Sequence, residues 1–196
     1  MRRFVFALAA AVAVIAPASA HGQGITITPA VGLYIPANDF YNLRDEASNA
    51  TIEKEGTFAM GLNVEFGSLR GSVAYASGAQ VNDRGLIDRE NIGEGKVLAV
   101  AGDLVIRPLP RILVQPYLLI GAGLRREDFD YEDDGISDAF PKEQSDFAFH
   151  LGIGADVMLG RLGVVAEFTD FLTQEPTGDW NQHDAFGFVG LKVKIK

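Results

Sequence analysis

FAMGLNVEF, residues 58–66, alternates strictly between two kinds of side chain. The apolar set is Phe58, Met60, Leu62, Val64 and Phe66, and the residues between them are small or polar. Because a β-strand turns successive side chains to opposite faces, the stretch predicts a strand with one apolar face and one small, polar face. The alternation alone does not say whether the apolar face meets a protein core or lipid.

The first twenty residues have the composition of a secretory signal peptide. Arg2 and Arg3 give a basic start, residues 4–15 are all apolar, and Ala18-Ser19-Ala20 forms a small-x-small cleavage site. The apolar run is too short to span a bilayer, which takes roughly 20 residues. We therefore expect residues 1–20 to be removed and residues 21–196 to form a single folded domain.

The composition of the remaining chain excludes several classes of protein. Removal of residues 1–20 takes away two arginines and no acid, which leaves a formal charge of −11 and argues against a nucleic acid partner. The chain has no cysteine, so it can form neither a disulfide nor a thiolate metal site. No apolar run after residue 20 is long enough for a membrane helix, so any membrane insertion must use strands.

The same alternation recurs in eight segments after the signal peptide. Their length matches the ~9–11 residues that a tilted strand needs to cross a bilayer, and it exceeds the mean of soluble sheets. The segments are residues 25–36, 58–66, 69–77, 97–108, 114–125, 147–159, 162–171 and 186–196. We therefore predict eight antiparallel strands.

The connections between these segments alternate between short and long. Three are short, and the four long ones carry most of the acidic residues: 37–57, 80–96, 126–145 and 174–184. Eight strands that start and end on one side would have three connections on that side and four on the other. The pattern predicts a closed up-and-down barrel, because outer-membrane barrels have short periplasmic turns and longer extracellular loops.

The polar faces of the predicted strands are rich in glycine, alanine, serine and threonine. A soluble barrel of the lipocalin type would instead carry lysine and glutamate on its outer face. Small residues suit the interior of an eight-stranded barrel, which is just wide enough for side chains to fill. We therefore predict that the apolar faces point outward into lipid and the polar faces point into the lumen.

The charged residues of the strands fall almost entirely on the predicted inner face. Acids and bases balance there, as a desolvated network requires, because an unpaired buried charge is strongly unfavourable. Asp170 breaks the pattern, since it falls on the apolar face at the outer end of its strand. The predicted lumen charge network comprises Glu65, Arg70, Asp103, Arg107, Arg125, His150, Asp156, Glu167 and Lys192.

Two segments carry a family resemblance. VQPYLLIGAGL (114–124), with Pro-Tyr followed by Gly-x-Gly, resembles a recurrent fifth-strand pattern of the small, porin-family-like outer-membrane β-barrel proteins of Gram-negative-type bacteria. LGVVAEFTDF (162–171) resembles their seventh-strand pattern. Together with the signal peptide and the order of strands and turns, the resemblance covers residues 25–196 and implies an eight-stranded transmembrane barrel in the bacterial outer membrane.

The resemblance also implies partners. Such barrels sit among outer-membrane lipid and lipopolysaccharide, and the barrel-assembly machinery reads an aromatic residue at their C-terminus. This chain ends in VKIK, which departs from that signal although Val193 and Ile195 keep its apolar positions. We expect a monomer with both termini in the periplasm and no cofactor.

The resemblance leaves the function open, since members include adhesion proteins, stability proteins, narrow channels and a few lipid-modifying enzymes. We expect a non-enzymatic protein with an envelope structural or surface-interaction role. The alternative is a narrow channel for small or apolar solutes. A second alternative, a hydrolase that modifies lipid A, would need a histidine with serine and an acid, for which His150, Ser145 and Asp146 are the candidates.

The acidic stretch DYEDDGISD, residues 130–138, resembles the front half of a calcium loop. The bidentate glutamate expected at the twelfth position is missing, because Pro141 stands there. The weak calcium candidates are Asp130, Glu132, Asp134 and Asp138. A solvated acidic loop is the alternative.

Overall fold

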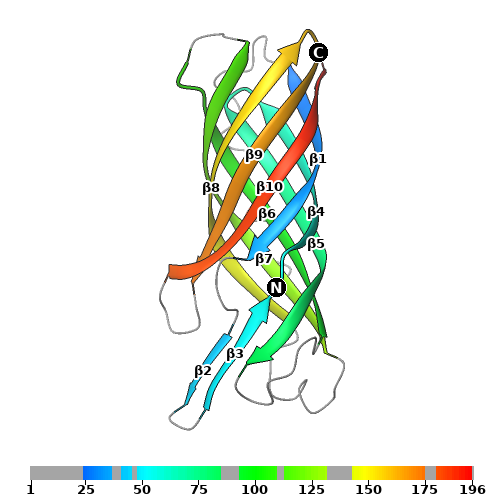
Figure 1. The fold of residues 1–196 in the computed structure, drawn as a ribbon. Coiled ribbons are helices and arrows are strands. Elements are labelled where there is room, and N and C mark those ends of the chain that lie inside the picture. Colours follow the sequence, from blue (N-terminus) through cyan, green and yellow to red (C-terminus); the bar gives the residue numbers. More distant parts are fainter. Residues whose placement is uncertain are drawn as a thin grey trace.

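The computed structural model describes residues 24–36, 41–45, 48–84, 93–109, 113–131, 143–174 and 180–195. These residues form ten strands (Figure 1). The strands are β1 (Ile25–Pro36), β2 (Tyr41–Asp45), β3 (Ser48–Lys54), β4 (Thr57–Phe66), β5 (Leu69–Arg84), β6 (Gly93–Ile106), β7 (Val114–Tyr131), β8 (Glu143–Leu159), β9 (Leu162–Gln174) and β10 (Trp180–Ile195). The predicted signal peptide, residues 1–20, lies outside the described residues. Within those residues, the structure has no helix with the length and apolar character that a membrane span requires.

Eight of the strands close into an antiparallel barrel, which confirms the predicted fold. Strand β1 pairs with β4, and β4 to β10 then pair in chain order, until β10 returns to β1. When the pairing is followed from strand to strand once around the barrel, starting at Ala155 on β8, it returns to β8 at Ser145, ten residues earlier in the sequence. A stagger of this size tilts the strands by about 40° from the barrel axis.

The two ends of the barrel differ. At one end, which we call the turn end, Gly67-Ser68 joins β4 to β5 and Gly160-Arg161 joins β8 to β9. Gly67 and Gly160 have φ values of 64° and 71°, which glycine adopts without the strain that a side chain would cause. The opposite end, which we call the hairpin end, bears β2 and β3 (Figure 1).

The strands extend further toward the hairpin end than the alternation predicts. Strand β7 continues to Tyr131 and β8 begins at Glu143, although both residues fall in the predicted loop 126–145. The predicted loop 37–57 contains the paired strands β2 and β3, and β3 continues the sheet by pairing with β5. The extensions of β7 and β8 were missed because neither of their faces is continuously apolar there, so the sequence lacks the signal that marks the rest of the barrel. Strands β2 and β3 alternate, with Leu43, Ala50 and Ile52 apolar, but they are shorter than the ~9–11 residues that cross a bilayer.

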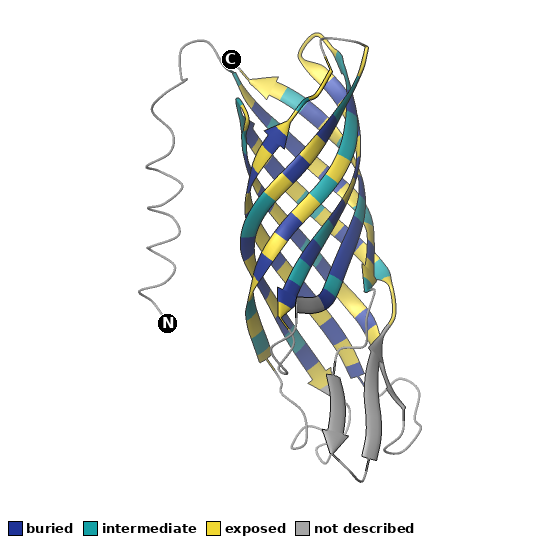
Figure 2. Cartoon of the chain, turned by 90° about the vertical axis from the view of Figure 1, so that its left-hand side faces the viewer, coloured by how far each residue is buried: buried dark blue, intermediate teal, exposed yellow. Residues whose placement is uncertain are grey.

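The apolar faces point outward, as predicted. Leu62 and Ile153 are 45% and 60% exposed, whereas Ala59 and Ala99 on the inner faces are inaccessible. Exposed and buried residues alternate strictly along β6, and bands of exposed and buried residues mark the barrel wall in Figure 2. A soluble protein would bury the larger side chains, so this inversion is the pattern of a wall that faces lipid.

The outward apolar band ends at a defined height. On β6 and β7 the outward series changes from Leu98 and Leu124 to Lys96 and Arg126 toward the hairpin end. On β8 the apolar outward residues run from Phe147 to Leu159, which at a 40° tilt spans about 30 Å, close to the thickness of a bilayer core. The strands therefore continue beyond the band at the hairpin end.

Candidate functional site

The candidate site is the set of polar side chains that fill the barrel. All nine residues of the predicted lumen charge network point inward, and every one except the half-buried Arg107 is buried. They separate into three groups along the axis, which we call the turn-end cluster, the middle cluster and the hairpin-end cluster.

Arg70 is at the centre of the turn-end cluster. Its guanidinium donates to Glu167 across the lumen, and its Nη2 lies 3.4 Å from the hydroxyl of Tyr117. The Tyr117 hydroxyl in turn donates to Glu167 over 2.5 Å. Arg70 is on β5, Tyr117 on β7 and Glu167 on β9, so these contacts join opposite sides of the wall.

The other charges of the turn-end cluster alternate in sign. Arg107 donates to Glu65 over 2.7 Å, and Lys192 donates to Asp156 over the same distance. Longer contacts of 3.6–3.7 Å link the two pairs to each other. Three cations therefore face three carboxylates, and this balance offsets the cost of removing the charges from water.

The ring of Tyr117 lies among the three cations of this cluster. The charged groups of Arg70, Arg107 and Lys192 lie 5.2, 5.6 and 5.8 Å from the ring centre. The negative face of an aromatic ring attracts cations at such distances. Tyr117 therefore stabilises the cations by its ring and one carboxylate by its hydroxyl.

Gly154 makes the contact between Tyr117 and Glu167 possible. It lies between them in the sheet, paired with Tyr117 on β7 and with Glu167 on β9. A Cβ at this position would come within 2.5 Å of the tyrosine ring. The absence of a side chain at Gly154 therefore makes room for the large side chain of Tyr117.

The middle cluster is built on Asp103. Its carboxylate accepts a hydrogen bond from Ser72 at 2.6 Å, and its other oxygen lies 2.6 Å from Nδ1 of His150. The imidazole stacks on Phe171 with ring centres 4.2 Å apart. Its Nε2 is buried and has no hydrogen-bond partner among the described residues.

The hairpin-end cluster surrounds Arg125, which is fully buried. The guanidinium donates to Asp184, and Nη2 lies 3.1 Å from Asp146 and 3.3 Å from Glu127. The hydroxyl of Tyr34 donates to the same Asp184. Glu127 and Asp184 fall in the predicted loops 126–145 and 174–184. For Glu127 a signal was present, because the inward positions of β7 continue without a break from Arg125 to Glu127 and Phe129.

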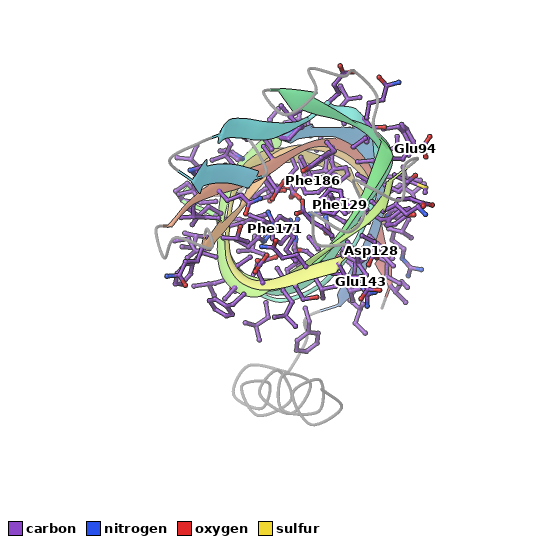
Figure 3. The ribbon with its side chains drawn as sticks, turned by 90° about the horizontal axis from the view of Figure 1, so that it is seen from below. Glu94, Asp128, Phe129, Glu143, Phe171 and Phe186 are labelled. Carbon is purple, nitrogen blue, oxygen red and sulfur yellow. The ribbon has the colours of Figure 1, made fainter. Side chains whose placement is uncertain are left out.

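An apolar layer separates the middle and hairpin-end clusters. Phe186 contacts Tyr34, Phe171 and Phe188 with ring centres 5.1–5.9 Å apart, and inward-facing alanines of β4, β5 and β6 lie in the same cluster. Viewed from the hairpin end, Phe129, Phe171 and Phe186 lie within the ring of strands, whereas Glu94, Asp128 and Glu143 lie on its outer side (Figure 3). Small side chains on one wall thus accommodate aromatic rings from the other.

The structure does not assemble the weaker candidates. Ser145 is exposed on the outer face, while Asp146 contacts Arg125 and His150 contacts Asp103, so no serine, histidine and acid of this set meet. Asp130 is exposed near the end of β7, and Glu132, Asp134 and Asp138 lie outside the described residues. The described ranges contain no group of three residues that could hold a metal ion.

Comparisons with known proteins agree with the fold. The family model described as "Outer membrane protein beta-barrel domain" matches residues 4–192, whereas no curated protein sequence matches the chain. Neisserial surface protein A has a similar structure, with a TM-score of 0.56, 13% identity, and coverage of 88% of this chain and 99% of that protein. A major outer membrane protein of Thermus thermophilus has a TM-score of 0.49 and 14% identity, with coverage of 89% of this chain and 100% of that protein. The chain therefore belongs to the outer membrane protein β-barrel domain family and is a bacterial outer-membrane barrel.

Proposed function

We propose that this barrel is a non-enzymatic, non-conducting protein with an envelope structural or surface-interaction role. The observation that carries the proposal is the filling of the lumen at every level. Tyr117, His150, Phe171 and Arg125 follow one another along the axis, and each is at most 2% exposed. Water does not reach these four side chains, which supports a lumen closed to ions.

The charged clusters support a structural role for the lumen. Charges that line a conducting pore face water, whereas Arg70 and Glu167 bind each other with side chains only 1% and 4% exposed. Removing one partner from such a pair is strongly destabilising, because the other charge remains buried. The clusters therefore stabilise the barrel by connecting strands on opposite sides of the lumen.

The arrangement of the middle cluster supports a non-enzymatic protein. In a catalytic triad the histidine lies between the serine and the acid, so that it can accept the serine proton. Here Asp103 lies between Ser72 and His150, and all three are buried. The proposal assigns this set to packing of the lumen and assigns contact with other molecules to the outer wall and the hairpin end.

The proposed partners follow from the exposed surfaces. The apolar band is matched to outer-membrane lipid, and the charged strand ends beyond it are at the height of lipopolysaccharide head groups. We further propose that the barrel-assembly machinery inserts the chain. Closure of the barrel through β1 and β10 leaves no open edge within the band, which supports a monomer.

Conductance of the purified barrel in planar bilayers tests the proposal. We expect no current steps from the wild-type protein, with a known porin as the positive control. Unitary steps that change when Arg125 is replaced in Arg125→Ala would show that ions pass the lumen and would contradict the proposal. Incubation of the barrel with lipid A, followed by mass spectrometry, tests whether the protein is an enzyme. We expect the mass of lipid A to stay unchanged. A change in mass that is lost in His150→Ala would indicate an enzyme.

A further inference from the structure

One charged residue interrupts the apolar outer wall. Asp170 on β9 faces outward, with Phe168 on its turn-end side and Leu172 on its hairpin-end side along the same strand. Of the outward residues that the structure describes within the band, it alone carries a charge. Because Leu172 is the last apolar position of the strand, Asp170 lies about 5 Å below the edge of the band.

Asp170 has one partner, which lies at the edge of the band. Its Oδ2 is 2.6 Å from Nδ1 of His183 on β10, while its Oδ1 is buried without a hydrogen-bond partner in the described structure. A carboxylate in hydrocarbon is costly, and such groups in membrane proteins commonly mark functional positions. The contact with His183 offsets that cost.

The geometry of the imidazole directs its second nitrogen toward the head groups. His183 pairs with Leu172 across the sheet and is therefore further toward the hairpin end than Asp170. The two ring nitrogens point in roughly opposite directions, so Nε2 faces away from Asp170. The side chain of His183 is 39% exposed, at the height where lipid head groups begin.

The wall beside this pair has one outward position without a side chain, Gly187. Ala185 faces outward but is only 6% exposed, and a Cβ on Gly187 would meet no atom within 4 Å. Leu33 on β1 and Phe168 on β9 project on either side of Gly187, with which both are paired in the sheet.

We propose that Asp170 and His183 bind the phosphorylated head of an outer-leaflet glycolipid, with Nε2 of His183 donating to a lipid phosphate and one acyl chain lying over Gly187. With an anion at each nitrogen, the imidazole donates one N–H to Asp170 and the other to the phosphate. Charge-assisted hydrogen bonds of this kind are the strong ones. The chain as a whole is acidic and repels phosphate, so a local donor is needed to hold such a head group.

The occupant is a lipid because of what surrounds the pair. A soluble anion would contact only Nε2 of His183, whereas a glycolipid phosphate also brings acyl chains that lie against the apolar wall below the pair. A glycolipid places its phosphates at the edge and its acyl chains below it, which matches the order of His183 and Gly187 along β10. Such binding is independent of whether the lumen conducts.

Nitrogen NMR of barrels labelled with ¹⁵N-histidine tests the contact directly. The barrel is placed in maltoside detergent micelles, which contain no phosphate, together with rough lipopolysaccharide, its dephosphorylated form, or inorganic phosphate alone. We expect the Nε2 resonance of His183 to shift only with phosphorylated glycolipid, while His150 in the lumen stays unchanged. An unchanged His183 signal, or equal shifts with the dephosphorylated lipid or with free phosphate, would overturn the proposal.

Lipid retention provides the second measurement. The number of glycolipids that stay with each purified barrel is measured by mass spectrometry for wild type, His183→Gln, Asp170→Asn and Lys96→Gln. We expect roughly tenfold weaker retention in His183→Gln and a partial loss in Asp170→Asn. Lys96→Gln removes another cation at the band edge and should retain lipid as wild type does. Equal losses in His183→Gln and Lys96→Gln would show nonspecific charge attraction and would contradict a defined site.

Discussion

Gly121 is the residue that allows Asp103 and His150 to meet. It is paired with Asp103 on β6 and with His150 on β8, so the two side chains contact each other over a position that has no side chain. A Cβ at Gly121 would lie 2.1 Å from the carboxylate of Asp103. The same arrangement recurs at Gly154, between Tyr117 and Glu167. Mid-strand glycines thus permit polar contacts between strands that are not neighbours.

We therefore expect Gly121→Ala to destabilise the barrel. The added methyl displaces Asp103 from its two partners, which costs about 1–3 kcal/mol for the overpacked site and more if His150 loses its contact. Urea unfolding in lipid vesicles measures the change. Gly71→Ala is the matched control, because a Cβ there meets nothing within 4 Å and should leave the midpoint unchanged. Similar midpoints for the two variants would show that the middle cluster tolerates displacement.

We expect the double substitution of Arg70 and Glu167 to destabilise the barrel less than the single substitution Arg70→Met does. Either Arg70→Met or Glu167→Gln leaves a buried charge without its main partner, and we expect a loss of about 3–5 kcal/mol for Arg70→Met. The double variant should recover part of this loss, because no charge of the pair remains. Losses that simply add in a double-mutant cycle would mean that the two side chains do not interact in the folded barrel.

At the scale of the strand, the outward face tests the depth of the apolar band. Ile120 on β7 is 53% exposed in the middle of the band, so Ile120→Arg should cost about 2–4 kcal/mol. Ser145 on β8 faces outward beyond the band, and Ser145→Arg should change stability by about 1 kcal/mol or less. The same urea assay compares them. An equal cost at both positions would place the band edge elsewhere.

The strands could be predicted from the sequence where one face is apolar and not where both are polar. Alternation placed Leu62 outward and Asp156 inward because lipid and lumen demand opposite side chains. Beyond the band, water bathes the outer wall, so Asp128 and Glu143 can occupy outward positions and the pattern disappears. The inward position of Glu127 was missed for this reason, whereas β2 and β3 were missed because their alternating runs are short.

The partners of the lumen charges could not be predicted at all. Local sequence fixes which residues face inward, but Arg70 meets Glu167 only because closure brings β5 opposite β9. That closure depends on the stagger of all eight barrel strands, which is a property of the whole wall and not of any segment. The inward position of each charged residue could therefore be predicted from the sequence, whereas the grouping of these residues into three clusters could not.

At the scale of the whole molecule, the seam between β1 and β10 is where the closed wall lacks a backbone contact. The pairing across this seam runs from Ile25 to Ile27, omits Thr28 and Pro29, and resumes at Ala30. Pro29 has no N–H to donate, and a proline inside a closed barrel has no free edge to face. The seam is therefore the weakest part of the band, because lipid cannot replace the missing donor.

Pro29→Ala should consequently stabilise the barrel. Two effects oppose each other: the restored donor satisfies a backbone group that costs about 1–3 kcal/mol when buried unpaired, while loss of the proline frees the unfolded chain by about 0.4–1 kcal/mol. The first is larger, so the unfolding midpoint should rise, and amide exchange along β10 near Leu191 should slow. A lower midpoint in Pro29→Ala, with exchange unchanged, would show that the seam is already satisfied and that closure does not limit the stability of this barrel.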